Sequence, residues 1–196
     1  GIAHLVGEGV TMLERLYANW VYGGVLAAPL FLALAPFVGM AAGHAALLVF
    51  LALPVYMLHQ YEEHDADRFR AFVNDMMDGE ALTVSDVFWI NYLGVWVLLI
   101  AALLLHATYA PGAGLIAPYL LLVNGLVHIA QAVKMKRYNP GLWTAVLMFL
   151  PLAAISLMEL EASLAAHLIS LAIVIGLHGL IVVNAMRRLA AHKQGD

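Results

Sequence analysis

The chain alternates between long apolar runs and short polar segments. Six runs are long enough to cross a hydrocarbon layer, which takes about 20 residues of helix. They are Trp20–Val38, Gly43–His59, Asp86–His106, Gly114–Met135, Pro140–Met158 and Leu164–Met186. The pattern predicts an all-α fold, a polytopic transmembrane helical bundle of about six spans, with residues 1–196 forming a single integral membrane domain.

Two further segments show an amphipathic pattern. In the long connection at residues 65–82, apolar side chains recur at helical spacing, and Gly79 follows as a stop signal. These side chains are Phe69, Phe72, Val73, Met76 and Met77. We expect a helix that lies in the membrane interface and either simply covers the bundle or gates access to it. Residues 1–18 have a similar amphipathic pattern.

Composition supports the membrane assignment and excludes several chemistries. Hydrophobic residues make up 64% of the chain and charged residues 11%, and the mean hydropathy is +0.89. The chain contains no cysteine, which excludes disulfides, thiolate catalysis and cysteine-ligated metal centres. A net charge of −4 argues against nucleic acid as a partner, so the expected partners are the lipid bilayer and a lipidic small molecule.

The basic residues fix an expected orientation. With six spans, all of them fall on one side of the membrane: Arg15, Arg68, Arg70, Lys134, Lys136, Arg137, Arg187, Arg188 and Lys193. The loops on the opposite side carry only Glu159 and Glu161 as charged residues. By the positive-inside rule both termini face the cytoplasm. We expect the protein in a bacterial inner or plasma membrane.

Candidate chemistry begins at the end of the second span, where the sequence reads His59-Gln60-Tyr61-Glu62-Glu63-His64. Ionisable residues at membrane depth are costly and usually functional. Helical spacing of three and four residues brings His59, Glu62 and Glu63 onto one face. On the same helical wheel His64 is expected to point away from that face.

Two more histidines are expected at a comparable depth. At 1.5 Å of rise per residue, His128 lies about 9 Å inside the cytoplasmic boundary, and His59 and His178 lie about 13 Å inside. Asn124 and Gln131 share a helix face with His128, and Asn91 lies near the same level. Three separate spans therefore bring imidazoles to one leaflet.

Together these residues predict a metal site. The expected ligands are His59, Glu62, Glu63, His128 and His178, with Asn91, Asn124 and Gln131 as supporting cofactor-binding residues. Imidazole and carboxylate ligands suit zinc or iron, as one or two ions. Glu62 and Glu63 are the catalytic candidates, since one would complete the ligand set and the other would serve as general base. The leading hypothesis is a metalloenzyme, a hydrolase or oxidoreductase acting on a lipidic or apolar substrate at the cytoplasmic leaflet.

Three alternatives stay open at this point. The same residues could form a carrier for a metal ion or proton, or a buried polar core without metal. His128 and His178 could instead hold a haem as axial ligands, which would leave both glutamates unexplained.

The string His59-Gln60-Tyr61-Glu62-Glu63 resembles the signature of a family of small multi-span membrane proteins named for its His-x-x-Glu-Glu (HXXEE) motif. Its position at the end of an early span also fits that family. The resemblance implies an integral membrane protein and identifies His59, Glu62 and Glu63 as site residues, but it implies no particular activity. His128 and His178 rest on the depth argument alone.

Overall fold

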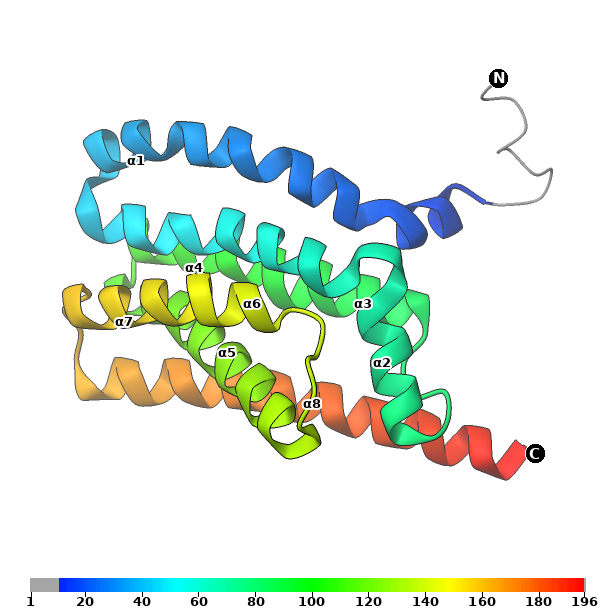
Figure 1. Cartoon of the computed structure of the whole chain (residues 1–196). Coiled ribbons are helices and arrows are strands. Elements are labelled where there is room, and N and C mark those ends of the chain that lie inside the picture. Colours follow the sequence, from blue (N-terminus) through cyan, green and yellow to red (C-terminus); the bar gives the residue numbers. More distant parts are fainter. Residues whose placement is uncertain (1–10, 196) are drawn as a thin grey trace, which may run out of the picture.

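The structure, a computed structural model, describes residues 11–195, and in this part of the chain it consists of helices without a β-strand (Figure 1). The helices are α1 Met12–His64, α2 Arg68–Met77, α3 Val84–Asn91, α4 Leu98–Thr108, α5 Ile116–Met135, α6 Leu142–Thr144, α7 Leu150–Glu159 and α8 Leu164–Gly195. The all-α prediction is confirmed. Residues 1–10 of the predicted amphipathic segment lie outside the described residues, and the rest of it leads into α1.

Short irregular helices connect several of these elements. The π-helical segments Tyr92–Val97 and Ala145–Phe149 join α3 to α4 and α6 to α7, so each pair runs as one continuous rod. The 3₁₀ turns Asp65–Asp67 and Pro111–Leu115 lead into α2 and α5.

Helix α1 is a hairpin of two antiparallel arms that bends at Gly43 (Figure 1). Gly43 has φ 86° and ψ 173°, a backbone conformation that glycine adopts without the penalty that a Cβ would bring. Five helical stretches are long and apolar enough to cross a membrane, and the first of them, Met12–Met77, contains both arms. The bundle therefore accommodates the predicted six spans.

The second arm of α1 forms the centre of the bundle. It packs on α4, α5 and α7, and its buried residues Val49 and Tyr56 join Leu99, Leu121 and Phe149 in the main core. The first arm instead exposes a row of large apolar side chains: Leu26, Leu30, Leu34 and Phe37. In a membrane protein such a face lies against lipid, which is as apolar as leucine.

Helix α2 has the predicted amphipathic pattern and packs at one end of the bundle. Its inner face contributes Val73 to a second core that also contains Trp20, Phe88 and Leu189. On its outer side Arg137 forms an ion pair of 3.3 Å with the exposed Asp75. The helix therefore closes the end of the bundle at which the His-x-x-Glu-Glu motif lies.

Candidate metal centre

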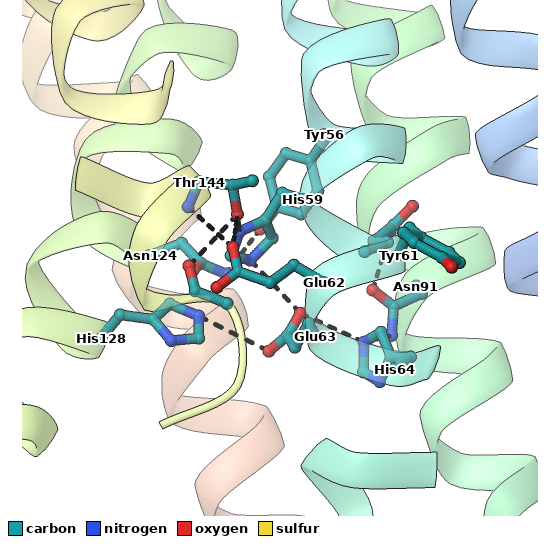
Figure 2. A network of polar contacts seen from close by, with 12 residues as sticks. Tyr56, His59, Tyr61, Glu62, Glu63, His64, Asn91, Asn124, His128 and Thr144 are labelled. Atoms are coloured by element: carbon teal, nitrogen blue, oxygen red, sulfur yellow. Dashed lines mark hydrogen bonds and ion pairs between the residues drawn. The ribbon is translucent and has the colours of Figure 1, made fainter. Parts of the chain in front are cut away.

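The Glu63 carboxylate is the centre of a buried polar cluster on the last turns of α1 (Figure 2). Its Oε2 lies 3.3 Å from Nε2 of His59, one helical turn earlier, as the four-residue spacing requires. Its Oε1 lies 3.5 Å from Nε2 of His128, which α5 contributes. His59, Glu63 and His128 are all buried, and their ligand atoms lie within 4.8 Å of one another. The structure thus brings together three of the predicted metal ligands.

The hydrogen bonds of His128 fix which of its ring nitrogens carries a proton. The Asn139 amide donates from Nδ2 to the main-chain carbonyl of His128 at 2.9 Å, so its Oδ1 must face the ring. Nδ1 of His128 lies 3.1 Å from that oxygen and must donate its proton to it, because an amide oxygen only accepts. In the neutral ring, Nε2 is then an unprotonated lone pair directed at Glu63.

A second chain of hydrogen bonds fixes the His59 ring in the same way. The Thr144 hydroxyl donates to Oε2 of Glu62 at 2.5 Å and has no second proton to offer. Nδ1 of His59, 2.8 Å from that hydroxyl oxygen, is therefore the donor. Nε2 of His59 is left as a buried lone pair without a hydrogen-bond partner.

When both rings are neutral, two lone pairs and one carboxylate converge on one point. For metal bonds of about 2.1 Å, neighbouring ligands of a tetrahedral ion are roughly 3.4 Å apart. The separations of 3.3 Å and 3.5 Å from Glu63 to the two imidazoles match this spacing. Metal-bound histidines also characteristically donate their other N–H to a fixed acceptor, as both rings do here. The three residues could therefore hold a metal ion.

Gly141 covers this cluster. It has φ +94°, and a Cβ at this position would lie 2.7 Å from Cε1 of His59 and 2.8 Å from Cε1 of His128. Only a residue without a side chain can therefore pass over the two rings. The turn before α6 closes the cluster on this side.

Glu62 lies outside the three-residue cluster. Its carboxylate accepts the main-chain N–H groups of Trp143, at 3.1 Å, and of Thr144, at 2.7 Å, at the start of the α6 rod. A carboxylate at a helix N-terminus is favoured by the unpaired N–H groups there. The Tyr138 hydroxyl also donates to it at 2.8 Å. Burial, followed by this bond to Glu62, raises the pKa of Tyr138 to about 12, so the phenol stays a donor at neutral pH.

With the Thr144 hydroxyl, the Glu62 carboxylate accepts hydrogen bonds from four donors. As an acceptor of so many hydrogen bonds it has little capacity left to act as a general base. Its contact with Thr144 instead links it to the ring of His59.

The prediction that His64 points away from the motif face was wrong. His64 is buried, and its Nε2 lies 3.1 Å from Oε2 of Glu63. The reason is local: His64 is the last residue of α1 and has φ −113° and ψ −4°, so its side chain leaves the regular helical direction. Its ring packs between those of Trp20 and Phe69, at centroid distances of 5.3 Å and 5.4 Å.

His178 is, after Glu62, the second predicted ligand that the structure leaves outside the cluster. Its Nδ1 bonds to the main-chain carbonyl of Val174, 2.9 Å away in its own helix, and its ring lines a cavity that Glu63 and His128 also line. The depth argument placed His178 at about the right level. It gave no information on the direction of the ring.

The three predicted supporting residues have different partners. Gln131 accepts from the Asn139 amide at 3.1 Å, and so supports the His128 partner. Asn91 accepts from Gln60 at 2.8 Å, and its Nδ2 lies 3.2 Å from Nε2 of His64. Asn124 bonds to the hydroxyl of Tyr56 at 2.6 Å. Asn91 is connected to Glu63 through His64, and Gln131 through Asn139 and His128.

A cavity of about 270 Å³ lies beside the cluster. Glu63, His64 and His128 form part of its wall, together with apolar side chains of α2, α3, α5 and α8. A mostly apolar cavity with a few convergent polar groups is the usual form of a small-molecule site.

Sequence reasoning missed Thr144, Asn139 and Gly141. They lie on or beside one turn, and the only sequence signal was the Asn-Pro-Gly string that begins it at residue 139. Such a string predicts a turn. It does not say that the turn packs on a histidine pair, because that contact joins segments about 80 residues apart.

Comparison with known proteins returned one match. The model of a family described as proteins of unknown function with an HXXEE motif matches residues 50–156, more than half of the chain. No curated protein and no solved structure shows a match. The matched region contains the motif residues His59, Glu62 and Glu63 as well as His128 and Thr144. The chain therefore belongs to the HXXEE family.

Proposed function

We propose that this protein is a membrane metalloprotein that binds one divalent cation, zinc or iron, through His59, Glu63 and His128. We further propose that it is an enzyme that acts on an apolar substrate held in the adjoining cavity. The observation that carries the proposal is the pair of buried Nε2 lone pairs, of His59 and His128, that face one carboxylate.

The charge balance favours a metal over a network of hydrogen bonds alone. If one imidazole were protonated, it would form an ion pair with Glu63, but the other ring would still present a buried lone pair without a donor. Leaving such an acceptor unpaired costs about 1–3 kcal/mol. A dication satisfies both lone pairs and the carboxylate together and offsets the cost of burying the charge of Glu63.

The neighbouring residues support an enzymatic role. A bound zinc ion supplies Lewis-acid chemistry, and a bound iron ion supplies oxidative chemistry when an electron donor is present. His64 lies against Glu63 and lines the cavity, so it is the imidazole best placed to exchange a proton with a substrate. The Phe69 ring lies 5.4 Å from that of His64 and adds an apolar surface beside it, and apolar surroundings strengthen electrostatic interactions.

Elemental analysis of the purified protein tests the proposal. We expect about one zinc or iron ion per chain in the wild type and loss of that ion in both Glu63→Gln and His128→Ala. Zinc would point to hydrolytic chemistry and iron to oxidative chemistry.

His178→Ala is the matched control. His178 lines the same cavity as His128 but bonds only to its own helix, so this variant is expected to keep its metal. A wild-type protein that is purified without metal and binds none on titration would refute the proposal. Equal metal loss in His178→Ala and His128→Ala would show that the ligand set is wrong.

A further inference from the structure

The lining of the cavity is mixed. Glu63, His64 and His128 form the part that we call the polar end, and Asn91, Asn124, Gln131 and His178 also line the cavity. Most of the other lining residues are aliphatic or thioether side chains from α2, α5 and α8, among them Val73, Met76, Val127, Ile181 and Val182. A ligand that fills the cavity is therefore expected to combine a polar group with an apolar body.

The mouth of the cavity opens sideways. Among its lining residues, Val182 is 60% exposed, Met186 51%, Val127 41% and Met76 39%. They belong to α8, α5 and α2, so the cavity reaches the surface where these three helices meet. Val127 and Val182 lie about 8–10 Å of helix rise before the basic residues that end their spans. In a membrane this mouth faces the acyl chains just below the head groups.

The polar end is closed on its other sides. The Phe69 ring of α2 lies 5.4 Å from the ring of His64 and 6.5 Å from that of His128. Gly141 passes over His59 and His128 on another side. The exposed lining residues therefore mark the bilayer as the source of the ligand.

The volume of the cavity limits the size of the head group that it can bind. A volume of about 270 Å³ is just below the usual range for small-molecule pockets, and corresponds to about nine water molecules. A small head and part of one chain match this volume, with the rest of the chain in the mouth. We expect a bulkier phosphodiester head with two chains to be excluded.

We propose that the cavity binds a single-chain amphiphile with a small oxygen-bearing head, in the class of a long-chain fatty acid or fatty alcohol. The molecule enters from the bilayer between α5 and α8 and places its head beside Glu63 and His128. This proposal depends on the proposed function, because the metal site at Glu63 and His128 is the group that would bind the head. It adds the class of substrate to that function.

The test uses two neighbouring positions on α8. Val182 lines the mouth, whereas Val183 is 45% exposed and does not line it. Val182→Trp fills the mouth, and Val183→Trp adds the same ring on a face directed at lipid. Both changes are at exposed sites, so both variants are expected to fold.

Binding of palmitic acid and of 1-hexadecanol is measured by native mass spectrometry on the full chain, with zinc and iron content determined on the same samples. We expect saturable binding of at least one of the two by the wild type and by Val183→Trp, and at least tenfold weaker binding by Val182→Trp. Preference for the acid or for the alcohol identifies the head group. An excess of a two-chain phosphatidylcholine is expected not to compete.

Three results would overturn the proposal: no saturable binding of either probe, equal binding by the two tryptophan variants, or displacement by phosphatidylcholine. The content of zinc and iron separates this question from the proposed function. If the amphiphile binds as expected to a protein that holds neither metal, the metalloenzyme proposal fails and the binding site stands. If either metal is present and neither probe binds, the substrate class is wrong.

Discussion

Glu62 and Glu63 are neighbours in one motif, yet they have different partners. Successive residues of a helix point about 100° apart, so Glu63 faces the histidines of the cluster and Glu62 faces the start of the α6 rod. Thr144 joins the two, because its hydroxyl contacts both Glu62 and Nδ1 of His59. We therefore propose that Glu62 is a positioning residue, which orients His59 through Thr144.

Thr144→Val tests this link. The substitution keeps the shape of the side chain but removes the acceptor for Nδ1 of His59, which frees the ring to rotate or to change its protonated nitrogen. Loss of such a partner typically weakens metal binding by about 10- to 100-fold. We expect a loss of that size in a competitive zinc titration, and near wild-type affinity in Thr144→Ser. Equal affinities of all three proteins would contradict the role of the hydroxyl.

Gly141→Ala addresses the close packing above the cluster. A Cβ here would contact both imidazoles at less than 3 Å, and a residue with a side chain at φ +94° also pays about 1–2 kcal/mol for the left-handed backbone. We expect at least a tenfold loss of zinc affinity and a lower thermal unfolding midpoint in detergent.

Gly176→Ala serves as its control, because a Cβ at that position of α8 has no neighbour within 4 Å. It is expected to retain zinc and to be as stable as the wild type or slightly more so, since alanine favours a helix. A Gly141→Ala protein with unchanged zinc affinity would show that the turn does not pack on the rings as described.

At the scale of elements, one side chain of α2 ties this helix to the connection that follows it. Nδ2 of Asn74 donates to the carbonyl of Leu82 at 2.9 Å, and its Oδ1 accepts the N–H groups of Ala81, at 3.0 Å, and Leu82, at 2.9 Å. Ala81 and Leu82 are buried, so their main-chain groups have little access to water. This contact ties α2, which forms a wall of the cavity, to the connection that enters α3.

We expect Asn74→Ala to destabilise this region by about 1–3 kcal/mol, the cost of leaving buried main-chain groups unpaired. Hydrogen–deuterium exchange of residues 78–83 measures it, and faster exchange is the expected result. Asn74→Asp keeps the acceptor of both N–H groups and should show a smaller effect. Wild-type protection in the alanine variant would mean that α2 is held by its apolar face alone.

Helical periodicity predicted α2 but not the turn that connects it to α1. The pattern of Phe69, Val73 and Met76 predicted an amphipathic helix at residues 65–82, and α2 fills Arg68–Met77. Ala66 and Asp67 before it have positive φ values of 53° and 61°. Alanine gives no sign of a left-handed turn and aspartate favours one only weakly. The angle between α1 and α2, and with it the cavity wall, could therefore not be predicted.

For the whole molecule, the distribution of charge gives a test of orientation. The bend at Gly43 and the α4–α5 and α7–α8 connections lie at one end of the bundle, and α2 lies at the other (Figure 1). The end with α2 carries the basic residues, so we expect it to face the cytoplasm.

The absence of native cysteine makes labelling direct. Tyr109 is 89% exposed at the end without basic residues, and Glu80 is exposed beside α2. In intact cells a membrane-impermeant maleimide should label Tyr109→Cys and leave Glu80→Cys unlabelled, and inside-out vesicles should give the reverse. Labelling of Glu80→Cys in intact cells would show that the orientation is opposite to the one expected.

The sequence by itself determined the helical class, the division into apolar spans and the presence of a His/Glu site near one end. These features follow from local periodicity and from the cost of polar groups in an apolar span, so neighbouring residues suffice to predict them. The same periodicity brought His59 and Glu63 together and predicted the depth of His128.

The tertiary structure decided which polar residues meet. In the folded chain His178 bonds to the main chain of its own helix, and His64 contacts Glu63 at the end of α1. Glu62 accepts hydrogen bonds from the start of the α6 rod. The tertiary structure also placed the turn at Gly141 over two imidazoles from other helices. Depth along a span fixes only one coordinate of a side chain. Rotation about the helix axis and the approach of distant segments depend on how all the helices pack, and local sequence does not contain that information.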